Sequence, residues 1–263
     1  MPRRIVALLT DFGTAGPYVA AMKGAVLSVC QDIDLLDITH EVTPHDIAGG
    51  AAVLAAATPY LPRGTIVVAV VDPGVGAGRH ALAAESGGYV LLGPDNGLLA
   101  PLFDLWGVET LVSIEEPRFA RGAVSATFEG RDRFGPAAAW IAAGTAVAEL
   151  GPPLSRYRPL NGPPLRAEPR ALSGSVVWVD RFGNLVTNIS RRAWLGEGRG
   201  RAGVVSIAGA CVGEPVRTYA DLAAGAAGAL FGSPDQLEIA VREGSAAERF
   251  RAGPGAGVEV VWG

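Results

Sequence analysis

The stretch Val67-Val-Ala-Val-Val-Asp-Pro-Gly-Val-Gly-Ala-Gly-Arg79 decides the fold of this chain. Residues 66–71 form a continuous run of β-branched and other apolar residues, which predicts a strand buried on both faces. The run ends at Asp72, because the Pro that follows cannot continue a strand ladder and the next Gly permits a sharp turn. Open α/β sheets bind ligands at the carboxyl ends of parallel strands. The stretch therefore predicts a functional loop that carries Asp72 and Arg79; the alternative is a structural strand end with a surface Asp–Arg pair.

Up to residue 150 the chain alternates predicted strands with predicted helices, which is the pattern of a doubly wound α/β domain. Apolar runs predict strands at residues 5–9, 34–38, 66–71, 89–92 and 111–114. Apolar spacing and alanine-rich composition predict helices at residues 18–30, 47–58 and 136–150. We therefore expect a mostly parallel sheet in an N-terminal α/β domain that spans residues 1–152.

Polar side chains follow two further predicted strands. Asp11 comes directly after the first strand and is followed by a glycine, and Asn96 belongs to an Asp-Asn-Gly run after the strand at residues 89–92. Asp-Asn-Gly is also ordinary turn chemistry. Because ligands bind at strand ends of this kind, Asp11 and Asn96 are candidate substrate-binding residues.

The second part of the chain has a different pattern. Residues 153–170 are rich in Pro, Gly and Arg without periodicity, which predicts a linker. Residues 171–263 contain short β-rich runs separated by turn signals, with residues 221–227 as the only predicted helix. This pattern predicts a smaller antiparallel β domain, either a sandwich or a barrel.

Composition excludes several classes of protein. The 263 residues carry a net charge of −4, which gives no reason to expect nucleic-acid binding. Gly and Pro interrupt the apolar runs too often for a membrane-spanning helix, and the apolar run near the start is too short for a secretory signal. Cys30 and Cys211 stand alone in apolar surroundings, so we expect two buried thiols, no metal site, no disulfide and a cytoplasmic protein.

Six motifs in order along the chain carry a resemblance to a known family. They are Leu9-Thr-Asp-Phe-Gly13, Tyr18-Val-Ala-Ala-Met-Lys-Gly24, Asp37-Ile-Thr-His-Glu-Val42, Val71-Asp-Pro-Gly-Val-Gly76, Pro94-Asp-Asn-Gly-Leu98 and Asp180-Arg-Phe-Gly-Asn184. Together they resemble the S-adenosyl-L-methionine (SAM) hydrolases, also called SAM hydroxide adenosyltransferases, which are relatives of the fluorinase and chlorinase enzymes. The resemblance implies an α/β N-terminal domain, a C-terminal antiparallel β-barrel, and a homotrimer that binds SAM between neighbouring subunits without a further cofactor.

The same resemblance implies a catalytic trio. The family combines an Asp and an Arg of the central loop with a His from a Phe-His-Gly-Arg-Asp motif, and Asp72 and Arg79 match the first two. Glu129 stands where the family usually has the His, because this chain reads Phe-Glu-Gly-Arg-Asp there. A second departure is Gly16, at a position where the family usually places an Asp that meets the methionine amino group.

Substrate-binding residues are implied in both domains. In the N-terminal domain, Asp11 matches the residue that holds the ribose hydroxyls, and His45 lies where relatives stack an aromatic ring near the adenosine. In the C-terminal domain, three matches fall in one motif and a fourth follows later. Phe182 and Asn184 match the adenine-facing residues, Asp180 matches the acid at the methionine end, and Ser245 belongs to the strand-turn that closes over the ligand.

The chemistry agrees with these residue types. Breaking the C5′–S bond of SAM releases a neutral thioether, so the reaction needs a nucleophile in line with that bond and an acceptor for its proton. A carboxylate such as Asp72 orients water or takes its proton, and Arg79 stabilises hydroxide. Glu129 has two interpretations: a substitute base, or a partner of Arg131 or Arg79 that leaves the trio impaired.

Three functions follow from these observations. The preferred one is hydrolysis of SAM to adenosine and L-methionine by attack of water or hydroxide at C5′. A halide-using SAM adenosyltransferase is disfavoured, because the halogenases have Tyr-Pro where this chain has Asp-Pro at residue 72. The third is a SAM- or adenosine-binding protein that has lost turnover through the changes at Gly16 and Glu129.

Overall fold

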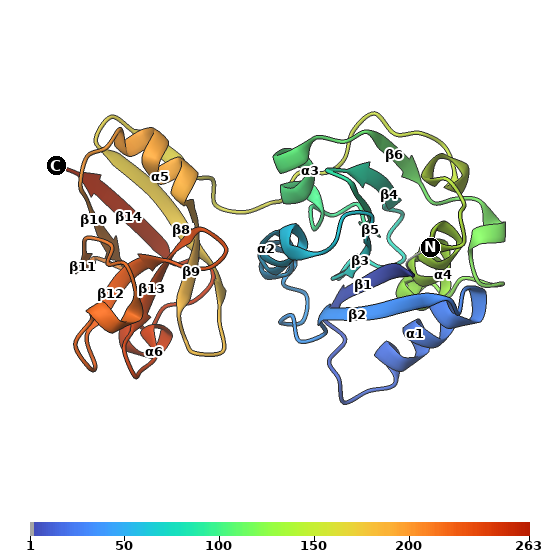
Figure 1. Cartoon of the computed structure of the whole chain (residues 1–263), viewed down its shortest axis with the longest axis horizontal. Coiled ribbons are helices and arrows are strands. Elements are labelled where there is room, and N and C mark those ends of the chain that lie inside the picture. The colour runs from blue at the N-terminus through green and yellow to red at the C-terminus, as the bar shows by residue number, and fades with distance from the viewer. Residues whose placement is uncertain (1–2) are drawn as a thin grey trace. The chain divides into compact units, whose positions relative to one another are not determined.

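A computed structural model describes residues 3–263 of the chain (Figure 1). The chain forms two compact units that divide between Asn161 and Gly162, and each unit has its own hydrophobic core. The first unit is an α/β domain and the second is an antiparallel β domain.

The first unit is organised around one six-stranded sheet with the order β2-β1-β3-β5-β4-β6. Strands β1, β2, β3 and β5 pair in parallel, and β4 pairs antiparallel with both β5 and β6. The predicted mostly parallel sheet is thereby confirmed. The strands are β1 Arg4–Thr10, β2 Ile33–Thr39, β3 Ile66–Val70, β4 Ala81–Ser86, β5 Tyr89–Pro94 and β6 Thr110–Ser113.

Helices cover both faces of this sheet, which explains why β1 and β3 are apolar along their whole length. Alternate residues of a strand point to opposite faces, and the two sets enter two separate clusters of buried side chains. One cluster contains residues of α1 and α4, and the other contains residues of α2 and α3. The helices are α1 Tyr18–Val29, α2 Ile47–Ala57, α3 Ala100–Trp106 and α4 Gly135–Ala142.

Two elements of this unit differ from the prediction. Strand β4 was not predicted, because its alanine-rich sequence lacks the β-branched residues that mark a strand. Helix α4 is shorter than the predicted helix at residues 136–150. Gly144 adopts a φ of 112° and ends the helical path, and Val147–Leu150 forms a separate 3₁₀ turn.

The second unit is a nearly closed antiparallel β-barrel, as the family resemblance implied. Its sheet has the order β11-β10-β14-β8-β9-β13-β12, with β7 paired to β8. The strands are β7 Arg166–Glu168, β8 Ala171–Val179, β9 Leu185–Ser190, β10 Gly203–Ile207, β11 Ala210–Gly213, β12 Ala227–Phe231, β13 Gln236–Val241 and β14 Gly257–Trp262.

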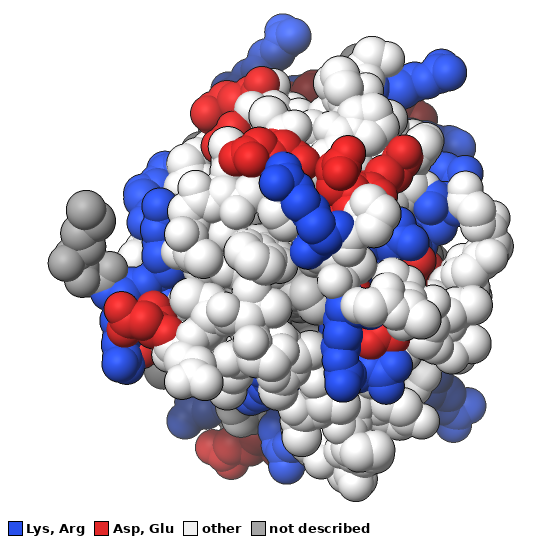
Figure 2. All heavy atoms as spheres, turned by 90° about the vertical axis from the view of Figure 1, so that its right-hand side faces the viewer, with Lys and Arg blue, Asp and Glu red and all other residues white. Residues whose placement is uncertain are grey.

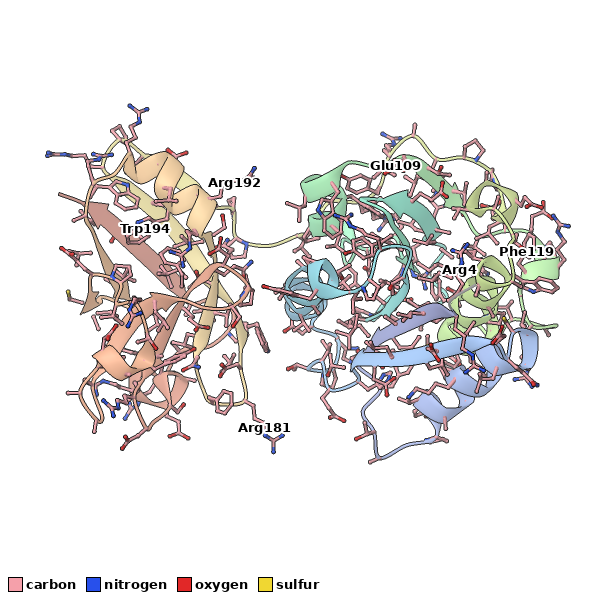
Figure 3. All side chains as sticks on the ribbon, in the orientation of Figure 1. Arg4, Glu109, Phe119, Arg181, Arg192 and Trp194 are labelled. Atoms are coloured by element: carbon pink, nitrogen blue, oxygen red, sulfur yellow. The ribbon has the colours of Figure 1, made fainter. Side chains whose placement is uncertain are left out.

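The helices of the second unit lie elsewhere than predicted. The predicted helix at residues 221–227 is wrong, since only the short 3₁₀ turn Tyr219–Asp221 forms there. Helices α5 Arg191–Gly198 and α6 Ala246–Phe250 form instead. Trp194 of α5, labelled in Figure 3, packs edge-on against Trp262 of β14, and the ring centroids are 4.7 Å apart. Tertiary packing of this aromatic residue outweighs the two glycines that weaken the helix in the sequence.

The surface features bear on the composition-based predictions. Over residues 3–263, the structure contains no helix with both the length and the apolar character needed to cross a membrane. On the face shown in Figure 2, basic and acidic side chains are interspersed. The two cysteines are free; Cys30 is half-buried but Cys211 is exposed, so the prediction of two buried thiols is wrong for Cys211.

Candidate active site

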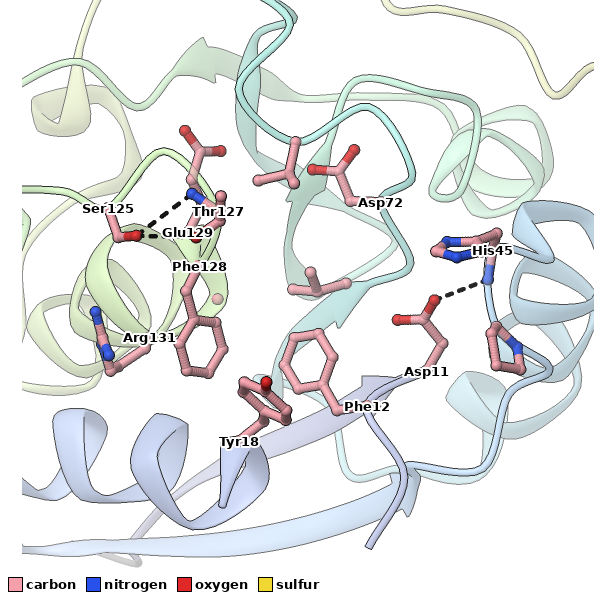
Figure 4. Close-up of a pocket in the computed structure, with 14 residues that line it drawn as sticks. Asp11, Phe12, Tyr18, His45, Asp72, Ser125, Thr127, Phe128, Glu129 and Arg131 are labelled. Atoms are coloured by element: carbon pink, nitrogen blue, oxygen red, sulfur yellow. Dashed lines mark hydrogen bonds between the residues drawn. The ribbon is translucent and has the colours of Figure 1, made fainter. Parts of the chain in front are cut away.

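The parallel pairing of β1 with β3 brings the loops that follow these two strands together. Asp11 follows β1, and Asp72 follows β3 after one buried valine. Both carboxylates line one pocket of about 570 Å³ in the first unit (Figure 4). We call this cavity the sheet-end pocket. Its other lining residues are Phe12, Tyr18, Pro44, His45, Val70, Val75, Ser125 and residues 127–131.

The Asp72–Arg79 pair is buried, and Asp72 lines this pocket. Arg79 donates from Nε to Oδ2 of Asp72 at 2.9 Å, and its Nη2 donates to the same oxygen. The exposed fractions of the two side chains are 4% for Asp72 and 6% for Arg79, so the surface-pair alternative is wrong. The loop between them needs Gly76, whose φ is 79° and where an added Cβ would lie 2.8 Å from the carbonyl oxygen of Ala126.

Glu129 completes a three-residue cluster with this pair. Nη2 of Arg79 donates to Oε2 of Glu129 at 2.7 Å, and Nη2 of Arg133 lies 3.4 Å from the other carboxylate oxygen. Arg131, the other partner considered, binds Asp132 instead, at 2.7 Å. Of the two predicted pairings, the structure therefore shows the one with Arg79.

The charge of Arg79 is secured by this cluster. Burial acts to lower the pKa of the guanidinium, but the hydrogen bonds and negative charges of Asp72 and Glu129 outweigh it, and the pKa of Arg79 is raised above its ordinary value. Arg79 binds only the Oδ2 oxygen of Asp72. The other carboxylate oxygen, Oδ1, is buried and has no hydrogen-bond partner among the described residues. The cluster thus combines a permanent positive charge with one unoccupied acceptor.

The Asp11 side chain is bound by a backbone N–H group just before the start of α2. The backbone N–H of His45 donates to Oδ2 of Asp11 at 2.9 Å (Figure 4). His45 adopts a φ of 69°, a left-handed conformation that His tolerates better than most residues. The structure therefore places the predicted ribose residue and the predicted adenosine neighbour side by side in the sheet-end pocket.

Asn96 lies outside the sheet-end pocket. Its Nδ2 donates to the carbonyl oxygen of Val71 at 2.9 Å, and its Oδ1 accepts from the N–H of Leu98 at 3.1 Å. It lines a separate cavity of about 510 Å³ that also reaches Asp72 and Arg79. Its side chain thus anchors the residue next to Asp72.

The four predicted residues of the C-terminal part lie in the second unit. Asp180, Phe182 and Asn184 line a cavity of about 810 Å³, which we call the barrel pocket. Oδ1 of Asp180 accepts from the backbone N–H groups of Phe182 and Asn184, each at 2.8 Å, so the carboxylate fixes this turn. The ring of Phe182 is 78% exposed, and the neighbouring Arg181 points away from the unit (Figure 3). Ser245 caps α6 and stands directly beside Gly183.

Several lining residues were missed by the sequence reasoning. Phe12, Tyr18 and Phe128 line the sheet-end pocket, and Glu238 and Tyr219 line the barrel pocket. The position of Phe12 and Tyr18 inside two of the quoted motifs was the available signal. No sequence signal pointed to Glu238, because a Glu on a strand is normally expected to face solvent. Burial raises the pKa of Glu238, and the nearby Asp180 adds to this effect against a hydrogen bond from Tyr219.

Apart from Asn96, the structure gathers the predicted residues into two clusters, each within one unit. No group of three His, Cys, Asp or Glu side chains in the described part of the chain has a geometry that fits a metal ion.

The sequence of the first unit matches the N-terminal domain model of the SAM hydroxide adenosyltransferases over residues 6–151, and the second matches their C-terminal domain model over residues 174–259. The chain belongs to the SAM hydroxide adenosyltransferase family.

Individual proteins are similar to this chain over nearly its full length. An (R)-S-adenosyl-L-methionine hydrolase of Salinispora tropica is 37% identical, covering 100% of this chain and 99% of its own. A protein of the same name from Thermus thermophilus is 40% identical, covering 93% and 94%. The crystal structure of an uncharacterized conserved protein from Thermotoga maritima superimposes with a TM-score of 0.90 at 29% identity, covering 97% and 99%.

Proposed function

We propose that this protein hydrolyses SAM to adenosine and L-methionine by attack of water at C5′. The observation that carries the proposal is the buried cluster in which Arg79 bridges Asp72 and Glu129, two carboxylates that line the same pocket as Asp11. The relatives named as SAM hydrolases support the choice of substrate.

In this proposal the reaction needs no cofactor. The water oxygen bonds to C5′ as the C5′–S bond breaks, and its electron pair stays on sulfur to give the neutral thioether of methionine. The proton of the water goes to Oδ1 of Asp72, the acceptor that has no partner in the described structure, and from there to solvent. Arg79 stabilises the hydroxide character that the attacking oxygen gains as its proton moves to Asp72.

Glu129 acts on Arg79 in this scheme. Its carboxylate is already engaged by Arg79 and Arg133, so Asp72 is the better placed proton acceptor. Glu129, at the position where the family usually has a His, holds the guanidinium beside Asp72 and shares its charge. A protein that binds SAM without turnover is the second candidate, because two carboxylates on Arg79 reduce the positive charge left for the attacking oxygen.

We further infer a homotrimer in which the barrel pocket of one chain faces the sheet-end pocket of its neighbour. The family resemblance supports this, together with the distribution of the predicted ligand residues over two separate units. We also infer a cytoplasmic location, where the exposed Cys211 thiol stays reduced.

Product analysis tests the reaction. The purified protein is incubated with SAM, with and without chloride, and the nucleosides are separated by chromatography. We expect adenosine and L-methionine in equal amounts under both conditions. Formation of 5′-chloro-5′-deoxyadenosine would identify a halide-using enzyme, and recovery of intact bound SAM would identify a binding protein.

A further inference from the structure

Three aromatic rings stand together in the sheet-end pocket. Phe12, Tyr18 and Phe128 come from the loop after β1, the start of α1 and the segment before Glu129. Their centroids are 6.2 Å (Phe12–Tyr18), 5.5 Å (Phe12–Phe128) and 5.4 Å (Tyr18–Phe128) apart, and the planes are steeply inclined. Such spacing is too tight for a ligand between the rings, so they present a continuous aromatic wall to the pocket.

The aromatic wall and the Asp72 carboxylate occupy different sides of the sheet-end pocket (Figure 4). In-line displacement at C5′ requires the leaving sulfur to lie opposite the attacking oxygen. A water at Asp72 and a ribose at Asp11 would direct the sulfonium away from Asp72, to the side of the pocket where the rings of Phe12, Tyr18 and Phe128 stand (Figure 4).

One ring of the wall already contacts a cation. The guanidinium carbon of Arg131 lies 4.9 Å from the ring centroid of Phe128. That arginine is already paired with Asp132, so it leaves little charge to repel a second cation. Aromatic faces attract soft cations, including quaternary ammonium groups, through the negative potential of the ring.

Gly16 belongs to the same arrangement. A Cβ added at Gly16 would lie 3.3 Å from the ring of Tyr18. The absence of a side chain at Gly16 therefore allows the Tyr18 ring to occupy its observed position. At this end of the pocket the chain therefore carries an aromatic surface beside a position without a carboxylate.

We propose that Phe12, Tyr18 and Phe128 bind the sulfonium group of SAM and discriminate it from neutral thioethers such as S-adenosylhomocysteine. This rests on the proposed function. The sulfonium loses its charge as the C5′–S bond breaks, so the wall stabilises bound substrate more than the transition state. Its removal therefore raises KM for SAM without lowering kcat.

The test compares charged and neutral ligands on ring-removal variants. Tyr18→Leu is the first choice, because this side chain is 52% exposed and its replacement leaves the core intact. Tyr18→Leu and Phe128→Leu are expected to raise KM for SAM by roughly 3- to 30-fold, the range that cation–π contacts supply. The inhibition constant of S-adenosylhomocysteine should change by less than about twofold, because it carries no sulfonium.

Two controls separate charge recognition from packing. Tyr18→Phe keeps the ring and removes only the hydroxyl, so it should regain most of the preference for SAM over S-adenosylhomocysteine that Tyr18→Leu loses. Tyr60→Leu removes a tyrosine that is 74% exposed and does not line the sheet-end pocket, and it should leave both constants unchanged.

The inference fails if the ring-removal variants weaken SAM and S-adenosylhomocysteine equally, or if KM for SAM does not change. It is separable from the proposed function. A parent protein that binds SAM without releasing adenosine contradicts hydrolysis, and the dissociation constants of the two ligands, measured by calorimetry, then decide the role of the aromatic wall. A parent protein that binds neither ligand contradicts both.

Discussion

Arg79 donates a hydrogen bond of 2.7 Å to Glu129 although the two residues are 50 positions apart in the chain. The contact joins the loop between β3 and β4 to the segment that precedes the π-helical turn Gly130–Phe134. It brings to Arg79 a carboxylate from the position at which the family motif usually has a His. The arginine thereby becomes the shared centre of a cluster with two acids, and its orientation depends on both.

Replacing Asp72 tests the proton acceptor. Asp72→Asn retains the shape but cannot take a proton, so turnover of SAM should fall by roughly 10²- to 10⁴-fold. Adenosine affinity, measured by calorimetry, should stay within about twofold, because Asp72 contacts the nucleophile and not the nucleoside. Asp32→Asn is the matched control, since Asp32 forms an exposed pair with Arg3. Parent-like turnover in Asp72→Asn would contradict the assignment.

Replacing Glu129 tests the support of Arg79. Glu129→Gln removes one of the two negative charges that pair with the Arg79 guanidinium. We therefore expect kcat to fall by roughly 10- to 100-fold. Glu129→His should keep more activity than Glu129→Gln, because the other motif residues match a family that uses imidazole there. The exposed Glu149, paired with Arg118, provides the control Glu149→Gln. Undiminished kcat in Glu129→Gln would show that Arg79 needs no second carboxylate.

Complementation tests the intersubunit site. Asp72→Asn damages only the first unit, and Asn184→Ala damages only the second. A mixed homotrimer contains sites in which both contributing units are intact, so an equal mixture, refolded together, should recover about a quarter of parent activity. Light scattering should report a trimer. Recovery of no activity above that of the separate variants, or a fully active monomer, would refute sharing of the site between chains.

Asp132 links pH to the stability of the first unit. Hydrogen bonds from Arg131 and from the backbone N–H of Ser125 lower the pKa of its carboxyl below the ordinary value of 3.8, against the effect of burial. A depressed pKa stabilises the folded state above pH 3.8, and this contribution is lost as the pH falls through the folded-state pKa.

Asp132→Asn should therefore lower Tm by a few degrees, roughly 2–8 °C, at pH 7. The difference from the parent protein should shrink below pH 3.8. Differential scanning calorimetry between pH 7 and pH 3 measures both effects. A Tm difference that is constant over this range would show that the carboxylate charge contributes nothing to stability.

The α/β class was predictable from local pattern, because β1 and β3 are buried on both faces and therefore read as uninterrupted apolar runs. Strand β4 and helix α5 could not be predicted from local pattern. Alanine, which dominates β4, has little preference for strands, and the glycines of α5 disfavour a helix. Both elements depend on neighbours distant in the chain, β4 on pairing with β5 and β6, and α5 on the contact of Trp194 with Trp262.

The sequence by itself determined which residue types end the central strands, and its ordered motifs determined the family. Only the tertiary structure decided which of the two arginines Glu129 binds and that Asn96 turns its amide to the backbone. It also decided that Phe12, Tyr18 and Phe128 form one wall. Periodicity and turn chemistry act over a few residues, whereas these contacts join segments many positions apart, and their geometry arises only when the sheet and its helices pack.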